Sequence, residues 1–276
     1  MGKYQELTKN IPWWSFGRET PASRVGRSLV PVGVFRSDPP PIPPEEALTF
    51  SLTDPSNEDY LMNIIGTAIQ AGTGKLVTCG HVVEALIKTE KRGYILSRIF
   101  RENTVICTPY PITNHRVIKY VDPRTDALNP SVDLAVLIIP AKSTKERPYE
   151  APSVKWGDST KLGVGNQVVV GGYPYGKEMF LWMKSNRGIL QPTFYSGIVS
   201  AILPATAPQE IRVIQASIPV AGGMSGGALF DPKTGKVIGM VTSGVEIRDI
   251  PQPMTYAIPS EIIAPFVEVI TFKTDS

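Results

Sequence analysis

From residue 62 onward the chain consists of short runs rich in valine, isoleucine and threonine, and glycine, asparagine, aspartate or proline breaks each run. Runs of this length with frequent turn residues indicate antiparallel strands rather than βαβ units. The 24 glycines and 26 prolines are more than a helix bundle would carry and suit a chain of many turns. We therefore predict an all-β fold made of two antiparallel β-barrels.

An N-terminal extension is expected to precede the barrels. It holds a strand-like run, SLVPVGVF, and a proline-rich segment, SDPPPIPPEE, which can form neither a helix nor a central strand. This segment is expected to be an extended linker; the alternative is a ligand for an SH3-like groove. We divide the chain into an extension with the first strand and linker at 1–45, a first barrel at 46–145, and a second barrel with a C-terminal helix at 146–276.

Two segments have helical character. Residues 82–91 (VVEALIKTEK) follow His81, and residues 260–270 (SEIIAPFVEVI) lie near the end of the chain. Ser260 is placed to act as the N-cap of the second helix.

Composition excludes several classes of protein. The 28 lysines and arginines nearly balance the 25 acidic residues, so the net charge of +3 excludes a dominant surface for nucleic acid. No apolar run approaches the roughly 18 residues that a membrane-spanning helix needs. Two cysteines (Cys79, Cys107) and two histidines (His81, His115) show no paired ligand spacing, which excludes a disulfide framework and a cysteine-based zinc site. We expect no metal ion and no organic cofactor.

The first 20 residues contain no apolar segment typical of a secretion signal. A cytoplasmic location is therefore expected, and a secreted or periplasmic one if the natural chain carries a signal that this sequence lacks. Trp13 and Trp14 in the N-terminal arm are candidates either for a contact between subunits of a homo-oligomer or for packing on their own barrel.

The segment AGGMSGGALFD (221–231) carries the first chemical signal. Ser225 stands between two pairs of glycines just before an apolar run. Glycines allow a sharp turn and leave backbone N–H groups free to point at one spot, which a nucleophile beside an oxyanion hole requires. An ordinary glycine-rich hairpin turn would have the same composition.

A serine nucleophile needs a base, and the chain offers two histidines. His81 lies in LVTCGHVV, where a strand ends and a short helix is expected to begin. His115 lies in TNHRVIK and is interpreted as a surface residue. His81 is therefore the candidate base.

The imidazole in turn needs a carboxylate that orients it. Asp133 begins the apolar run DLAVLII, where an aspartate without a partner would be costly. It could also cap its own backbone at the start of the strand. Asp126, in the segment RTDAL, is the competing carboxylate, but an aspartate in a loop needs no special explanation.

His81, Asp133 and Ser225 occur in the order of the chymotrypsin arrangement. Together with the stretches around them, the chain resembles trypsin-like (chymotrypsin-fold) serine peptidases, and within them the HtrA/Deg branch. The resembling stretches run in register over roughly residues 62–265, and they are GTAIQ…KLVTCGHVV, DLAVLII, WGDSTKLGVGNQVVVGGYPYG, SGIVSAI, IQASIPVAGGMSGGALFDPKTGKVIGMVTSG and YAIPSEII.

The resemblance implies two six-stranded barrels with the triad in the crevice between them. It assigns Ser225 as nucleophile, His81 as general base and then acid, and Asp133 as the group that orients His81. The remaining implied residues are the oxyanion-hole segment Gly223, Met224 and Ser225, the substrate-binding residues Thr242, Ser243 and Gly244, and Pro219 at the base of the specificity pocket.

The sequence departs from the family pattern at three points. Met224 stands where digestive enzymes have aspartate and HtrA relatives have asparagine. Cys79 occupies a position where small residues are usual and is interpreted as buried packing. Only 51 residues follow Ser225, fewer than the family's PDZ domain needs, so we expect that domain to be absent.

These residues predict an HtrA-like serine endopeptidase that acts on a protein or peptide and prefers an uncharged aliphatic residue at P1. Neither a nucleic acid nor a membrane is expected as a partner. The alternatives are an inactive scaffold that keeps the fold for binding, which Met224 leaves open, and a processing protease of narrow specificity.

Overall fold

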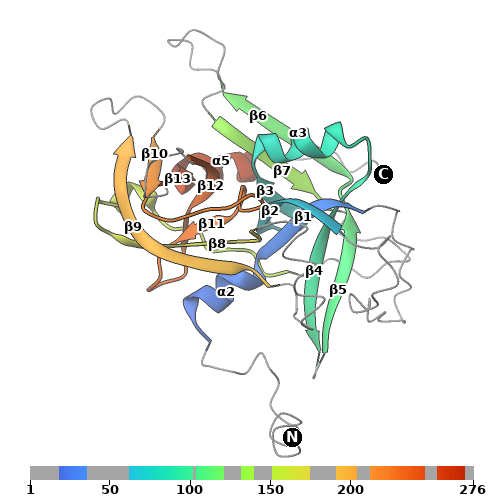
Figure 1. The fold of residues 1–276 in the computed structure, drawn as a ribbon, viewed down its shortest axis with the longest axis horizontal. Helices are drawn as coiled ribbons and strands as arrows, with labels where there is room; N and C mark the ends of the chain where they lie inside the picture. Colours follow the sequence, from blue (N-terminus) through green and yellow to red (C-terminus); the bar gives the residue numbers. More distant parts are fainter. Residues whose placement is uncertain are drawn as a thin grey trace, which may run out of the picture.

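The computed structural model describes residues 19–35, 62–101, 104–120, 132–139, 151–174, 191–203, 212–245 and 254–270 (Figure 1). The proline-rich segment, Trp13, Trp14 and Asp126 lie outside these residues. Within the described residues, no helix is long and apolar enough to cross a membrane.

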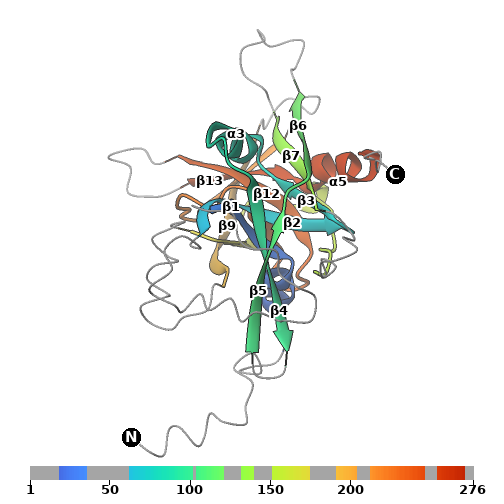
Figure 2. The same ribbon diagram turned by 90° about the vertical axis from the view of Figure 1, so that its right-hand side faces the viewer.

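The first half of the fold is a seven-stranded antiparallel sheet with the order β5-β4-β1-β2-β3-β7-β6. Its strands are β1 (Leu29–Phe35), β2 (Met62–Gly72), β3 (Lys75–Thr78), β4 (Gly93–Arg101), β5 (Thr104–Pro111), β6 (Asn114–Tyr120) and β7 (Val132–Ile138). The expected six-stranded first barrel is therefore wrong in detail: the described strands form a seven-stranded sheet that no described strand pair closes. The long β4–β5 hairpin extends away from the rest of the fold instead of curling back (Figure 2).

The second half is a closed barrel with the strand order β10-β13-β12-β11-β8-β9. Its strands are β8 (Gln167–Gly172), β9 (Thr193–Leu203), β10 (Val213–Ala216), β11 (Ala228–Phe230), β12 (Val237–Val245) and β13 (Met254–Pro259). The all-β class and the chymotrypsin-type architecture are confirmed. The exact division of the chain at residues 45 and 145 stays a prediction, although β1 pairs with β2 and β4 and so belongs to the first sheet.

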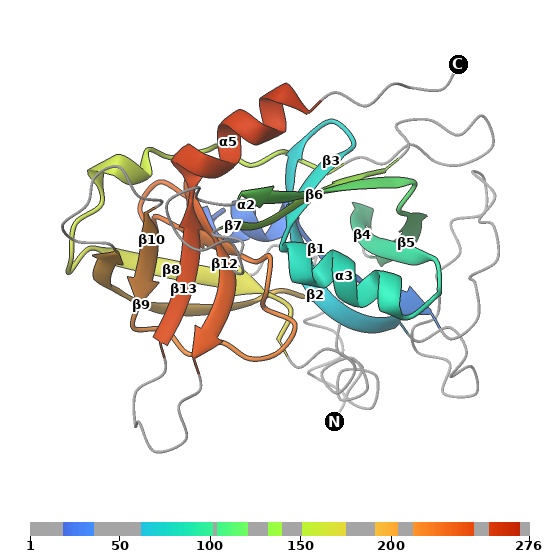
Figure 3. The ribbon, with the colours of Figure 1, turned by 90° about the horizontal axis from the view of Figure 1, so that it is seen from above.

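Both expected helices are present with shifted bounds. Helix α3 (Gly80–Lys88) begins just before His81, and α5 (Ser260–Val269) follows β13 directly (Figure 3). The assignment of Ser260 as N-cap is wrong: Pro259 occupies that position, and the Ser260 hydroxyl donates to the carbonyl of Gly157 at 2.8 Å.

One further helix, α2 (Pro21–Arg27), and a short 3₁₀ turn, η3 (Ser159–Lys161), were not expected from the sequence. The α2 helix begins with a capping box, in which Thr20 and Ser23 bond to each other's backbone. Thr20 followed by Pro21 was the sequence signal for this helix start.

The two halves share one hydrophobic core cluster, which includes Leu29 of β1 together with Phe230 and Met240 of the barrel. Tyr173 belongs to the same cluster, and its hydroxyl donates to the carbonyl of Leu29 at 3.1 Å. Because buried side chains and hydrogen bonds join the halves, the position of one half relative to the other is fixed.

Candidate active site

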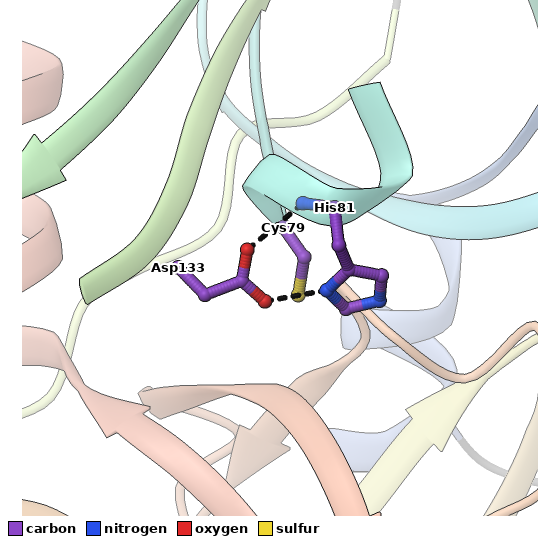
Figure 4. A group of neighbouring side chains, drawn as sticks. All are labelled: Cys79, His81 and Asp133. Atoms are coloured by element: carbon purple, nitrogen blue, oxygen red, sulfur yellow. Dashed lines mark hydrogen bonds and ion pairs between the residues drawn. The ribbon is translucent and has the colours of Figure 1, made fainter. Parts of the chain in front are cut away.

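His81 is positioned by the start of α3. Strand β3 ends at Thr78, Cys79 is the N-cap, and His81 is the second residue of the helix. Its ring nitrogen Nδ1 lies 2.5 Å from Oδ2 of Asp133, and its backbone N–H donates to Oδ1 at 2.9 Å (Figure 4). Two hydrogen bonds to one carboxylate fix the orientation of the ring.

Asp133 lies on β7, which pairs with β3, the strand that leads into this helix. A Cβ on Gly80 would lie 3.0 Å from Oδ1 of Asp133, so the glycine gives the carboxylate room at the first turn of the helix. The helix N-terminus favours a negative charge there. A third hydrogen bond, from the Thr242 hydroxyl to Oδ2 at 2.8 Å, comes from β12 of the other half. The alternative role of Asp133 as a cap of its own strand is therefore not needed to explain it.

The charges of His81 and Asp133 stabilise each other. The hydrogen bond and the negative charge of Asp133 raise the pKa of His81 above its usual value of 6.5, although burial acts in the opposite direction. Burial by itself would raise the pKa of Asp133, but the hydrogen bonds from His81 outweigh it and lower that pKa. The pair therefore favours an ionised carboxylate beside an imidazole that readily accepts a proton.

Cys79 lies under this pair. Its sulfur is one of three potential ligand atoms, with those of His81 and Asp133, that lie within 4.8 Å of one another. The thiol is fully buried, donates to the carbonyl of Val241 at 3.1 Å, and has its pKa raised by burial and by the charge of Asp133. Its full burial and its hydrogen bond to a backbone carbonyl fit the interpretation of Cys79 as a packing residue.

Ser225 lies on the loop between β10 and β11. Its hydroxyl donates to the carbonyl of Thr242 at 3.4 Å. Among the described residues it makes no hydrogen bond with His81, so the structure joins His81 and Asp133 directly and brings Ser225 to them through Thr242. A Cβ on Gly66 would lie 2.6 Å from Val82 and 3.1 Å from the Ser225 carbonyl, so only a glycine lets α3 and the serine loop approach this closely.

The oxyanion loop, residues 221–227, has two backbone N–H groups that are available to a ligand. Gly223 and Gly226 have φ angles of +93° and +85°, which glycine adopts without strain. Met224 is fully buried in the barrel core and donates its N–H to Ala221, while the N–H groups of Gly223 and Ser225 make no hydrogen bond with any described residue. Two unpaired amides beside a serine are what an oxyanion hole needs, and an apolar Met224 can brace the loop by packing.

The other sequence-predicted residues lie nearby or on the surface. Pro219 is exposed between β10 and the oxyanion loop, and Ser243 and Gly244 continue β12 beyond Thr242. Their roles in binding substrate stay predictions. His115 is an exposed residue of β6.

Comparison with known proteins identifies the family of the chain. The family model of the trypsin-like peptidase domain matches residues 66–240, most of the chain. The chain belongs to the trypsin-like peptidase family.

Among curated relatives of this trypsin-like peptidase, the serine protease Do-like HtrA of Lactobacillus helveticus is 28% identical over 187 residues, covering 59% of this chain and 40% of the relative. The probable periplasmic serine protease do/HhoA-like of Haemophilus influenzae is 29% identical over 171 residues, covering 58% of this chain and 34% of the relative. The alignments thus span well under half of these relatives.

Two solved structures share the fold. The HtrA-type protease AlgW with decapeptide matches with a TM-score of 0.56 and 18% identity, over 90% of this chain and 66% of that one. The inactive form of the Rv3671c protease matches with a TM-score of 0.51 and 18% identity, over 91% of this chain and 93% of that one. At these identities the likeness shows the fold alone.

We expect the kcat/KM of this trypsin-like peptidase on a peptide substrate to rise with pH through a midpoint above 6.5, because a general base must be neutral and Asp133 raises the pKa of His81. In Asp133→Asn, which removes the charge, the midpoint should move to lower pH at a much lower plateau. The His81 ring-proton shifts in Ser225→Ala should titrate at the same raised pKa, with His115→Gln identifying the second histidine signal. A wild-type midpoint at or below 6.5 would contradict the pairing.

Proposed function

We propose that the protein is a serine endopeptidase of the HtrA-like type, which hydrolyses peptide bonds through an acyl-enzyme. The observation that carries the proposal is the His81–Asp133 pair beside a serine loop in which the Gly223 and Ser225 amides make no hydrogen bond with any described residue. The relatives from Lactobacillus helveticus and Haemophilus influenzae are named as serine proteases, which supports the same activity.

The reaction begins when the Ser225 hydroxyl turns from the Thr242 carbonyl toward Nε2 of His81. Ser225 Oγ attacks the peptide carbonyl carbon, its proton passes to His81, and the carbonyl oxygen takes the negative charge. The amides of Gly223 and Ser225 donate to that oxygen. His81 then protonates the leaving amine, and a water molecule, deprotonated by His81, releases the acyl group and restores Ser225.

The arrangement of the oxyanion loop supports catalysis over the inactive scaffold. That alternative rested on Met224, which cannot form the polar brace of its relatives. Met224 is instead fully buried, with its sulfur 3.0 Å from where a Cβ on Gly172 would lie. A packed side chain can hold the loop as a polar one does elsewhere.

A fluorophosphonate probe tests the proposal. Intact-mass analysis should show one probe per chain, mapped to Ser225, and no labelling of Ser225→Ala. Ser217→Ala, which alters a serine of the same region hydrogen-bonded to Ile198, should label like the wild type. A folded protein that stays unlabelled would favour the scaffold. Digestion of unfolded casein separates a broad protease from a processing enzyme, which would leave it mostly intact.

The specificity expected at P1 is an uncharged residue of small or medium size, such as valine, alanine or leucine. Pro219 and its neighbours Ile218 and Val220 supply no carboxylate at the proposed base of the pocket. A hydrophobic pocket discriminates by about 1–3 kcal/mol per methylene, so the preference should be graded. Mass-spectrometric mapping of cleavage sites measures it.

The matched variants are Pro219→Asp and Pro219→Asn. The aspartate should increase cleavage after lysine and arginine relative to the asparagine, because it adds a charge in the pocket. Wild-type cleavage mainly after lysine or arginine would contradict the assignment of Pro219.

A further inference from the structure

Thr67, in the middle of β2, is a polar residue with no exposed surface. Its hydroxyl donates to the carbonyl of Gly223 at 2.8 Å and accepts the backbone N–H of Tyr173 at 3.0 Å. One buried hydroxyl thus joins the first sheet to the oxyanion loop and to the residue that follows β8. Because a buried hydroxyl is stable only when paired, this geometry is well defined.

The backbone of Thr67 holds the same loop at a second point. Its N–H donates to the carbonyl of Ser225 at 2.8 Å. Its own carbonyl is held by the hydroxyl of Thr78 at 2.7 Å. Thr67 therefore binds the carbonyls on both sides of Met224, and Thr78 fixes Thr67 in turn.

These contacts hold two peptide groups of the loop, Gly223–Met224 and Ser225–Gly226, by their carbonyl oxygens. The Gly223–Met224 peptide is held at both ends, its oxygen by the Thr67 hydroxyl and its N–H by the Ala221 carbonyl at 3.1 Å. The peptide groups that carry the N–H groups of Gly223 and Ser225 adjoin these two held groups, and both N–H groups remain unpaired among the described residues. The loop is thus held in the form that can receive an oxyanion.

We propose that Thr67 is a positioning residue for the oxyanion hole, and that its side-chain hydroxyl, through Gly223, keeps the loop in its catalytic form. The inference rests on the proposed function, because only a peptidase uses these amides. The Thr67 hydroxyl supplies, from β2, the polar contact to the loop that Met224 cannot supply. The same hydroxyl is hydrogen-bonded to the backbone of Tyr173, so a displacement of the backbone after β8 would also affect the hydrogen bond to Gly223.

Three variants separate positioning from simple stability. Thr67→Val keeps the shape of the side chain but removes its hydroxyl. Thr67→Ser keeps the hydroxyl and removes the methyl group. Ser260→Ala removes another buried hydroxyl, which donates to Gly157 far along the chain from the loop, and serves as the control. Thermal unfolding of all three variants measures their stabilities, so that losses of function can be compared at equal stability.

Hydrogen exchange of the Met224 amide is the readout that needs no activity. In Thr67→Val, loss of the Gly223 bond should speed this exchange at least about tenfold while the amides of α5 keep their wild-type rates. Thr67→Ser and Ser260→Ala should exchange at Met224 like the wild type. Unchanged exchange in Thr67→Val would overturn the proposal, whatever the activity.

Kinetics provide the second readout. Thr67→Val should lower kcat on a peptide about 10–100-fold with little change in KM, below the loss of about 10²–10³-fold for a deleted oxyanion-hole donor. Its affinity for a peptide boronate should fall in step with kcat/KM, and the pH midpoint should stay that of the wild type. Thr67→Ser should recover most of the rate.

The outcomes distinguish this proposal from the proposed function. A wild-type protein that neither hydrolyses peptides nor reacts with fluorophosphonate refutes the peptidase, and the exchange of Met224 still decides whether Thr67 positions the loop. An active wild type with undiminished kcat in Thr67→Val refutes the role of Thr67 alone. An equal loss of kcat in Ser260→Ala at equal stability would also overturn it.

Discussion

Replacing Ser225 by alanine should abolish peptide hydrolysis, lowering kcat on the order of 10⁴–10⁶-fold, while the protein stays folded. Among the described residues the hydroxyl makes a single long hydrogen bond, 3.4 Å to the Thr242 carbonyl, so its loss should cost little stability. Single-turnover kinetics on a fluorogenic peptide and a thermal melt measure the two quantities. An active Ser225→Ala protein would rule out the proposed mechanism.

His81→Ala and Asp133→Asn test whether the three residues act together. Each should lower kcat by about 10⁴-fold or more. His81 transfers the proton, and Asp133 holds His81 in place through two hydrogen bonds. The double variant Ser225→Ala/His81→Ala should be little worse than either single one, since triad members work as a unit. Additive losses would argue against a shared step.

Gly226→Ala should be the most destabilising small substitution in the oxyanion loop. Gly226 has a φ of +85°, and a Cβ there would lie 2.0 Å from the Thr67 carbonyl oxygen and 2.5 Å from the Thr78 hydroxyl. Neither atom can retreat, because these two groups hydrogen-bond each other. Backbone strain and overpacking together should lower the free energy of unfolding by about 3–5 kcal/mol and abolish activity.

Gly165→Ala is the matched control for the cost of placing a side chain at a positive φ angle. Gly165 has a similar φ of +88°, but a Cβ there would meet nothing within 4 Å. Its replacement should cost only about 1 kcal/mol and leave kcat unchanged. Chemical denaturation of both variants measures the difference, and equal losses would show that the contact with Thr67 is unimportant.

Much of the site could be inferred from local sequence, because local patterns encode local structure. The glycines around Ser225 marked a tight loop with available amides, and the strand-to-helix transition at His81 placed that residue where α3 begins. Asp133 was marked by its position at the head of an apolar strand, where it needed a partner; that partner is the ring and backbone of His81, 52 residues away.

Other features gave no local signal. Thr67 lies in an unremarkable apolar run, yet it bonds to Gly223, 156 residues away. Thr242 was expected to bind substrate, but its side chain also binds Asp133, 109 residues away. A threonine in a strand has the same local pattern whether its hydroxyl faces a catalytic group or its own backbone, so the sequence did not distinguish these residues from ordinary ones.

The alternation of apolar and turn residues determined the strands, and the resemblance of successive stretches determined the family, because both are properties of consecutive residues. Only the tertiary structure decided that the described strands of the first half form a seven-stranded sheet that none of them closes, that Met224 packs into the barrel core, and that Thr67 holds the oxyanion loop. Each of these depends on which segments, distant in the chain, come within a few ångströms of each other. Hydrogen bonds and packing act over those distances in space, and one sequence does not record them.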